Sequence, residues 1–344
     1  MTSEATSRWR ANVSAPGIVS IDTEAIPAVG PGEALISMRM AGVCGSDTHA
    51  YHGKHPQMKI PYYPGHEVVG IVEAVGADVE HVAIGQRVTP EPTLPCGTCK
   101  VCQRGDENVC ENLQFFGCGY REGGMASVFT VPADRLRTIP EEFTDEQAIL
   151  IEPLATPVHA ARLAGDLTDR VVLIHGCGTI GLLMLAAAKH AGARRVVMTD
   201  LLQAKRDIAV RLGADVAIDP SDPDFIQNAL AELGEAADTI FDCVSIQSTV
   251  DASTQIVSKA GVIVIVGVPA RPVTLDLPTI QDRQIRVQGA ATYVTEDYDT
   301  ATEIIRAGLV DPDVMVSKHF GYQDVQEAFD LAATGVEIKV VLTA

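Results

Sequence analysis

The sequence predicts an α/β protein that joins a doubly wound parallel sheet domain to a mostly β domain. Three observations point to this fold class. Residues 1–155 form short alternating apolar runs separated by Gly and Pro, residues from 156 onward alternate between strand and helix patterns, and a glycine-rich turn joins the first strand of that second region to its first helix. A chain of 344 residues is also too long for one ordinary hydrophobic core.

The composition indicates a soluble protein whose partners are small molecules. Hydrophobic residues make up 47% of the chain and charged residues 21%, a balance typical of globular domains. The net charge is −19 without a cluster of Lys and Arg, which argues against nucleic acid. No apolar run could span a bilayer or serve as a secretory signal. With eight cysteines and no export signal, we expect a reduced, cytoplasmic setting.

The first region is expected to be β structure with irregular loops. Residues 33–40 and 68–75 have the alternation of strands, and Pro-Gly or Gly-Gly turn signals separate such runs. In the second region, residues 156–292, an apolar strand at 171–175 precedes an Ala- and Leu-rich helix at 180–191. Further strands are predicted at 195–199, 215–218, 239–242 and 262–266, with a helix over 202–211. Strands that alternate with helices in this way imply βαβ units and a parallel sheet.

The last region, residues 293–344, contains two helical patterns and a final strand at 338–342. We expect it to return to the first region.

Four cysteines in one short polar loop predict a structural zinc site. Cys96, Cys99, Cys102 and Cys110 have the spacing C-x2-C-x2-C-x7-C. Structural zinc takes four soft ligands in a closed tetrahedron, and thiolates at this density supply them. The alternative is a pair of loop disulfides, which needs an oxidising compartment that nothing else in the chain indicates. Because a closed zinc site seldom performs chemistry, the catalytic residues are expected elsewhere.

The turn after the 171–175 strand has the G-x-G-x-x-G spacing of a dinucleotide-binding loop, with Gly176, Gly178 and Gly181. The first glycine makes the tight turn, the second lets the backbone approach a pyrophosphate, and the third lets the helix pack on the strand. The pyrophosphate would lie at the helix N-terminus near Thr179. Asp200 ends the next strand, where a carboxylate accepts from a ribose 2′-hydroxyl and repels a 2′-phosphate, so we expect NAD. The alternative is a glycine-rich turn without a ligand.

Candidate ligands of a second zinc are Cys44, His66, Glu67 and Glu152. Glu152 is a carboxylate in an otherwise apolar stretch at the predicted domain junction. Three protein ligands with an open fourth position are the arrangement of catalytic zinc. Taken singly, a buried cysteine usually only packs in a core, and a lone histidine or glutamate usually lies on the surface.

Taken together, these motifs resemble the zinc-containing medium-chain dehydrogenase/reductase family, in particular its polyol (sorbitol, L-iditol or butanediol) dehydrogenase branch. The resemblance covers nearly the whole chain, with the motifs in the family's order. It implies a GroES-like catalytic domain with both zinc sites over residues 1–155, a Rossmann NAD-binding domain over 156–292 and a return segment over 293–344.

The resemblance also implies that Cys44, His66 and either Glu67 or Glu152 hold the catalytic zinc. One thiolate, one neutral imidazole and one carboxylate make a Zn²⁺ site formally neutral. A second ionised carboxylate would make the site anionic and raise the pKa of a bound alcohol. We therefore expect only one of the two glutamates to coordinate at a time, with the other acting through the zinc-bound water.

The implied reaction is hydride transfer from the alkoxide of a secondary alcohol to nicotinamide, with zinc as the Lewis acid. Ser46, two residues after Cys44, can hydrogen-bond the alcohol oxygen, and His49 can pass the proton to solvent. The alternative for His49 is a plain surface histidine, which is also our expectation for His52 and His55.

Family position points to further cofactor neighbours at Ile180, Lys205 and Val266-Gly267-Val268. Because Lys205 and Arg206 are basic residues close to Asp200, use of NADP as well as NAD is the alternative. Sorbitol dehydrogenases tend to carry Arg before the Tyr near the return segment, where this chain has Thr292, and Tyr directly after the relay His, where it has Ala50. These differences point away from sorbitol itself and leave other polyols, diols and secondary alcohols.

The sequence therefore predicts a cytoplasmic, zinc- and NAD-dependent dehydrogenase that converts a secondary alcohol to a ketone, and a homo-oligomer, either dimer or tetramer, as the family implies. The alternatives are an amino-alcohol dehydrogenase like L-threonine 3-dehydrogenase, and a non-catalytic relative that binds NADH or serves as structure. Four other residues are expected only to pack in the core, namely His159, Cys118, Cys177 and Cys243.

Overall fold

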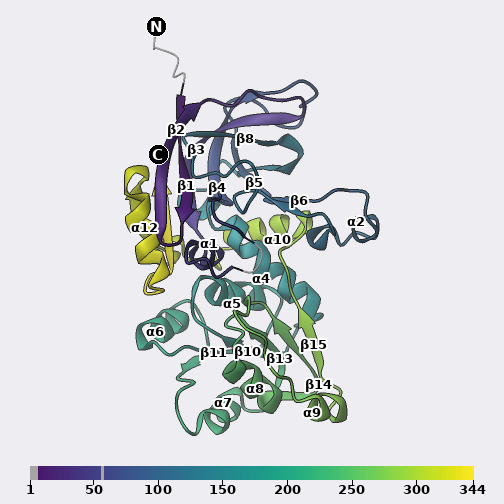
Figure 1. Cartoon of the computed structure of the whole chain (residues 1–344). Helices are drawn as coiled ribbons and strands as arrows, with labels where there is room; N and C mark the ends of the chain where they lie inside the picture. The colour runs from purple at the N-terminus through teal and green to yellow at the C-terminus, as the bar shows by residue number, and fades with distance from the viewer. Residues whose placement is uncertain (1–6, 56–57) are drawn as a thin grey trace. The chain divides into compact units, whose positions relative to one another are not determined.

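The computed structural model describes residues 7–55 and 58–344, which divide into two compact units. Unit 1 contains the chain up to Glu152 together with Pro312–Ala344, and unit 2 contains Pro153–Asp311 (Figure 1). The chain thus begins in unit 1, builds unit 2 and then returns. The return starts at Pro312, later than the residue 293 expected from the sequence, because helix α10 (Thr295–Arg306) packs on α5 (Thr179–His190) and so lies in unit 2.

Unit 1 is built on a seven-stranded sheet in the order β16-β17-β3-β4-β5-β9, in which β8 also pairs with β3. The strands are β3 (Glu33–Val43), β4 (Glu67–Val75), β5 (Arg87–Pro90), β8 (Val128–Pro132), β9 (Leu136–Thr138), β16 (Val316–Gly321) and β17 (Lys339–Thr343). The remaining strands form two small sheets, β1 (Ser7–Ala15) with β2 (Ile18–Ala25) and β6 (Thr93–Leu94) with β7 (Gln114–Phe115). The unit's helices are α1 (Gly45–Tyr51), α2 (Lys100–Gln103), α3 (Asp145–Ala148), α11 (Pro312–Met315) and α12 (Val325–Ala333).

The central strand β3 explains why this sheet forms. Ala34, Ile36, Met38 and Met40 alternate along it and are buried, as the period of two predicts. After the return, β17 pairs antiparallel with β3, with Val340 opposite Val43. The end of the chain therefore lies directly beside the strand that leads into the Cys44 segment.

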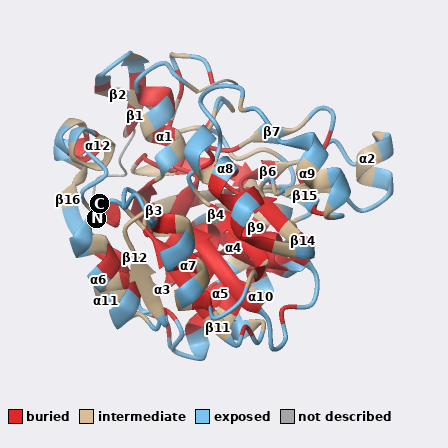
Figure 2. Cartoon of the chain, turned by 90° about the horizontal axis from the view of Figure 1, so that it is seen from below, coloured by how far each residue is buried: buried red, intermediate tan, exposed pale blue. Residues whose placement is uncertain are grey.

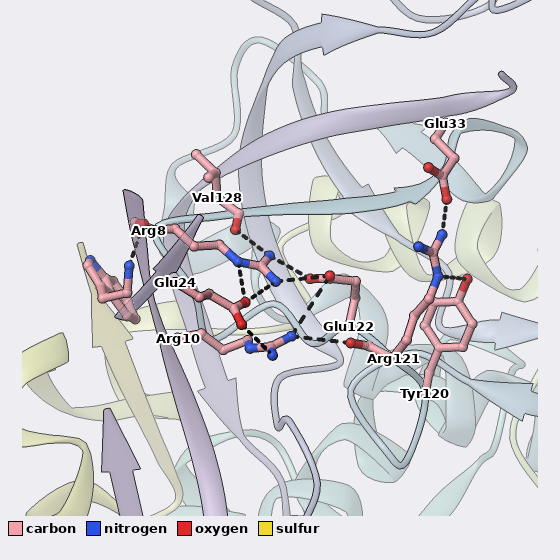
Figure 3. A network of polar contacts seen from close by, with 10 residues as sticks. Arg8, Arg10, Glu24, Glu33, Tyr120, Arg121, Glu122 and Val128 are labelled. Atoms are coloured by element: carbon pink, nitrogen blue, oxygen red, sulfur yellow. Dashed lines mark hydrogen bonds and ion pairs between the residues drawn. The ribbon is translucent and has the colours of Figure 1, made fainter. Parts of the chain in front are cut away.

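A buried ionic network fixes the N-terminal strand to the segment before β8 (Figure 3). Arg8 donates to Glu122 at 2.6 and 2.9 Å and to Glu24 at 2.5 and 2.8 Å. Arg10 donates to the other oxygen of Glu24 at 2.9 Å. The side chains of Arg8 and Glu122 are only 3% and 7% exposed. The network anchors the segment that also carries Cys118.

Unit 2 contains a six-stranded parallel sheet in the order β12-β11-β10-β13-β14-β15. Its strands are β10 (Val171–His175), β11 (Arg195–Thr199), β12 (Val216–Ile218), β13 (Ala237–Asp242), β14 (Val257–Ile265) and β15 (Arg286–Gly289). The chain starts in the middle of the sheet and builds outward first on one side, then on the other. This order confirms the predicted doubly wound fold, whose ligand position is the switch point beyond β10 and β13.

The helices of unit 2 connect these strands. They are α5, α6 (Gln203–Arg211), α7 (Phe225–Leu233), α8 (Gln247–Ile256), α9 (Leu277–Asp282) and α10, and α4 (Ile151–Ala164) leads in from unit 1. Buried residues gather in the strands and along α5, where residues 181–188 are all buried (Figure 2). Among the described residues, no helix has both the length and the apolar character needed to cross a membrane.

Candidate functional site

The four loop cysteines converge on one point. Cys96, Cys99, Cys102 and Cys110 each place a ligand atom within 4.8 Å of the others. The Sγ–Sγ distances are 3.4 Å for Cys99–Cys102, 3.5 Å for Cys96–Cys110 and 3.8 Å for Cys99–Cys110. A disulfide needs about 2.05 Å, whereas a tetrahedron with Zn–S bonds of about 2.3 Å has edges near 3.8 Å. All eight cysteines lie in the described ranges and all are free thiols, so the donor set fits zinc better than disulfides.

Backbone N–H groups already point at these sulfurs. Cys96 Sγ accepts from the N–H of Cys99 at 3.4 Å, and Cys99 Sγ accepts from the N–H of Cys102 at 3.4 Å. The pKa of Cys96 is lowered to about 5, first by the backbone of Thr98 and then by its hydroxyl. These contacts thus favour the thiolate of Cys96, the form that binds zinc, whereas burial raises the pKa of Cys102.

A second cluster forms where β3 and β4 lie side by side. Cys44 follows β3 and is the N-cap residue of α1, while His66 and Glu67 stand where β4 begins. The register places Gly42 opposite Glu67, so the end of one strand meets the start of the other. One ligand atom from each of Cys44, His66 and Glu67 lies within 4.8 Å of the others. Three of the four predicted ligands therefore come together.

Among the described residues, the fourth candidate, Glu152, does not belong to that compact group. It is 5% exposed, in the first turn of α4, and its charge acts on Lys339. The carboxylate is thus buried within electrostatic range of the same cluster.

Two residues around His66 were not singled out as site residues in the sequence. Asp47 is fully buried, accepts from the backbone N–H of Cys44 at 3.1 Å and lies 3.8 Å from His66 Nδ1. Cys118 Sγ lies 3.3 Å from the same nitrogen and is more than a small packed residue. Because Asp47 and Cys118 both face Nδ1, they orient the imidazole for binding through its other nitrogen. Asp47 could have been found from its place three residues after Cys44, whereas Cys118 carries no local signal.

The third residue that sequence reasoning missed is Lys339, the first residue of β17. Its Nζ donates to both oxygens of Glu67, at 2.6 and 2.7 Å. The two side chains are 3% and 0% exposed. Burial lowers the pKa of Lys339, but the charges of Glu67, Cys44 and Glu152 together raise it above its ordinary value. Lys339 is therefore a buried cation beside the candidate ligands.

The same crowding shifts other groups of the cluster. Burial alone lowers the pKa of His66, but Cys118, Asp47 and Cys44 raise it well above its usual range. Burial raises the pKa of Asp47 to about 6 and that of Cys118 to about 11. Perturbed groups gathered in this way are typical of a functional site.

The two predicted relay residues lie on α1. Ser46 is half-buried in the first turn, and His49 is exposed one turn later. Residues three apart share one face of a helix, so the two side chains lie on the same face of α1.

The glycine turn of unit 2 has the geometry expected of each position. Gly176 has φ +94°, which favours glycine, and a methyl group on Gly181 would overlap the carbonyl oxygen of Gly176. A methyl group on Gly178 would meet no atom within 4 Å, so the backbone there is open to a ligand. Thr179 begins α5 directly after Gly178. The turn can therefore receive a pyrophosphate at a helix N-terminus.

Asp200 is tied to that turn. Its carboxylate accepts from the N–H of Cys177 at 2.9 Å and from the N–H of Leu202 at 2.9 Å. Arg206 points its guanidinium at backbone carbonyls, that of Asp200 at 2.5 Å and that of Leu201 at 3.0 Å, and pairs with Asp219 at 3.2 Å. Arg206 is thus held by the protein itself, and the neighbouring basic residue Lys205 is half-buried.

The other predicted cofactor neighbours lie near the end of β14. Val266 is buried, Val268 is 49% exposed, and Gly267 packs so closely on Cys243 that a side chain would not fit. Ile180 is half-buried in the first turn of α5. His159 is buried against Asp297 at 2.8 Å, as expected of a packed histidine.

The fold and these groups of residues define a zinc-dependent oxidoreductase with a dinucleotide cofactor. Two family models match the chain, the alcohol dehydrogenase GroES-like domain over residues 30–141 and the zinc-binding dehydrogenase domain over 179–307. The chain belongs to the zinc-containing medium-chain dehydrogenase family, in its polyol branch, and the predicted enzyme class is confirmed.

Its relatives span almost the whole chain. L-threonine 3-dehydrogenase of Deinococcus deserti is 32% identical over 337 residues, 96% of each chain. A probable D-xylulose reductase A of Aspergillus niger is 28% identical over 333 residues, 94% of this chain and 93% of the relative.

Solved structures agree. An alcohol dehydrogenase from Escherichia coli CFT073, complexed with NADH, has a TM-score of 0.92 and 28% identity over 99% of this chain and 100% of its own. A zinc-binding dehydrogenase of Sinorhizobium meliloti 1021, bound to NADP, has a TM-score of 0.92 and 30% identity over the same shares.

Proposed function

We propose that the protein is a zinc-dependent, NAD-linked dehydrogenase that oxidises a secondary hydroxyl of a polyol or diol and reversibly gives a ketone. The observation that carries this proposal is the meeting of Cys44, His66 and Glu67 within 4.8 Å, beside a buried Asp47 and Lys339. Relatives named as a D-xylulose reductase, an L-idonate 5-dehydrogenase and a sorbitol dehydrogenase support the substrate class.

The role of each residue follows from its donor atoms. Cys44, His66 and a carboxylate from Glu67 or Glu152 would hold the catalytic zinc, and the four loop cysteines, Cys96 to Cys110, would hold a structural one. When bound, the catalytic zinc supplies a Lewis acid for the substrate oxygen, and NAD accepts the hydride. Asp47 keeps the His66 ring oriented for this task.

The chain's own proton path runs along α1. Ser46 Oγ would accept the proton of the substrate hydroxyl and pass on its own toward His49, which is exposed to solvent. A histidine suits the last step because it gains and loses a proton near neutral pH.

Asp200 supports NAD as the preferred cofactor. Its carboxylate is fixed beside the glycine turn, where it would accept from a ribose 2′-hydroxyl and repel a 2′-phosphate. Arg206, which could have attracted that phosphate, is engaged with backbone carbonyls.

A second candidate is an amino-alcohol dehydrogenase that acts on L-threonine, favoured by the relative from Deinococcus deserti. The two are separated by assaying purified protein with L-threonine, 2,3-butanediol and a panel of polyols, scored by NADH absorbance. Turnover of polyols or diols, lost when zinc is chelated, supports the first candidate. Turnover of L-threonine alone replaces it with the second. No turnover and a single bound zinc would favour a non-catalytic relative.

We also propose that the protein works in the cytoplasm as a homo-oligomer, either a dimer or a tetramer. The acidic composition and reduced cysteines support the compartment. Light scattering after size-exclusion chromatography gives the oligomeric state directly, and a monomer would contradict this proposal.

A further inference from the structure

A buried ion pair crosses the strand at the centre of the candidate metal site. Lys339 belongs to β17 and Glu67 to β4, and β3 lies between them in the sheet. Lys339 Nζ nevertheless contacts both Glu67 oxygens at 2.6 and 2.7 Å, and reaches the carbonyl of Val43 at 3.4 Å. The contact therefore reaches across β3 and joins the return segment to the candidate metal cluster.

Gly42 is what lets this pair form. It lies on β3, directly opposite Glu67 in the register, between the two charged residues. A methyl group built on Gly42 would overlap Oε2 of Glu67 and come within 3.2 Å of its Cβ. Any side chain there would push the carboxylate off its present position.

The charges show what the pair does to the site. Cys44, Glu67 and Glu152 contribute three negative charges when ionised, and a Zn²⁺ ion leaves one of them uncompensated. Lys339 supplies a positive charge against that excess, directly beside Glu67, and Asp47 adds a further buried carboxyl near His66. Both partners are almost fully buried, where an uncompensated charge is costly.

We propose that Lys339 is a positioning residue that restrains Glu67 and so limits how strongly this carboxylate binds the catalytic metal. The inference rests on the proposed function, in which Cys44 and His66 hold that metal. Both oxygens of Glu67 are shared with Nζ, although the carboxylate lies near enough to Cys44 and His66 to reach an ion held there. A carboxylate freed from Lys339 would donate more charge to the metal and oppose the formation of the substrate alkoxide.

The test is the rate at which a chelator removes zinc from Lys339→Met, compared with the native enzyme. Two phases are expected, and the phase that is missing from Cys44→Ser belongs to the catalytic site. In Lys339→Met we expect that phase to slow about tenfold and kcat to fall about tenfold, with a smaller change in KM, because the freed anion strengthens metal binding. Lys339→Arg should return near native values because it keeps the pair. The double variant Lys339→Met/Glu67→Gln should lose zinc faster than Lys339→Met, because the freed anion is absent.

A purely structural Lys339 predicts the opposite sign, because a loosened site would lose zinc at the native rate or faster. Arg8→Met is the matched control, since it breaks a pair of similar burial with Glu122 and should lower the melting temperature without slowing zinc loss. Gly42→Ala gives the same test if Lys339→Met does not fold, because it displaces the Glu67 carboxylate and keeps both charges. Unslowed zinc loss in whichever of these folds overturns the inference, while an absent Cys44-dependent phase in the native enzyme overturns the proposed function itself.

Discussion

The two units build their sites in different ways. In unit 2 the dinucleotide site is local, because the glycine turn, the start of α5 and Asp200 all lie within 176–200, and each position has the geometry that its spacing predicts. In unit 1 the catalytic cluster joins residues at the end of β3 and at the start of β4, and its buried cation comes from β17, after the whole of unit 2 in the chain. The cysteine loop is the local exception within unit 1. The comparison shows that a site can be predicted from sequence when its contacts join residues that lie close together along the chain.

The largest effect should follow from breaking the assembled cluster. Cys44→Ser is expected to lower kcat/KM by about a thousandfold or more, since it removes the Lewis acid that stabilises the alkoxide, a loss of at least about 4 kcal/mol. Zinc content should fall by one ion per chain while the melting temperature changes little. Retained activity would show that the chemistry does not depend on this cluster.

Breaking the cysteine loop, the local site of unit 1, should lower stability and leave activity almost unchanged. Cys102→Ser is expected to cost on the order of 3 kcal/mol of unfolding free energy, because metal binding at such a loop is folding free energy. Chemical denaturation measures this, and kcat of the protein that remains folded should stay within about twofold, since a closed zinc site performs no chemistry. A thousandfold loss of kcat without loss of stability would contradict the assignment of a structural site.

In unit 2, Asp200→Ala should raise KM for NAD by about 10- to 100-fold. The substitution removes one or two hydrogen bonds to the ribose and also loosens the glycine turn. KM for NADP should fall at the same time, because the carboxylate no longer repels a 2′-phosphate. Initial rates with each cofactor measure the ratio. An unchanged ratio would mean that Asp200 only supports the turn through Cys177.

The smallest effect concerns pH and a buried histidine in β10. His175 is fully buried, and burial lowers its pKa although Asp242 acts in the other direction. Because the unfolded chain takes up a proton near pH 6.5 and the folded chain does so only at lower pH, stability should decline as pH falls from about 7 to 5.5, by about 1 kcal/mol. His175→Leu should flatten this dependence, which urea denaturation at several pH values measures.

The exposed His190, at the end of α5, is the control for that experiment. His190→Leu should keep the native pH dependence, and an equal flattening in both variants would rule out His175 as the cause.

Much of the fold could be predicted because it depends on local periodicity. The strand at 171–175 and the helix after it were expected within one residue of their observed bounds, since an apolar run, a glycine turn and a helical pattern follow one another directly. The cysteine spacing was equally local. The predicted strand at 262–266 is too short, because β14 begins at Val257 and its next residues, Ser258, Lys259 and Ala260, are half-buried or exposed and form no apolar run.

The catalytic cluster could be predicted only in part. Cys44, His66 and Glu67 were recognised by motif, but spacing along the chain could not show whether Glu67 or Glu152 lies nearer the others. Lys339 was unpredictable because a lysine near a final strand is usually solvent-exposed, and only the pairing of β17 with β3 brings it to Glu67. Cys118 was assigned to packing for the same reason, since its partner His66 lies far away in sequence.

The position of Lys339 in the chain also orders events during synthesis. Glu67 is made early, yet its cation follows only after the ribosome has added the whole of unit 2. Until then Glu67 lacks its counter-ion, and burying its carboxylate alone would be costly. The Glu67–Lys339 pair can therefore form only after all the residues of unit 2 have been made.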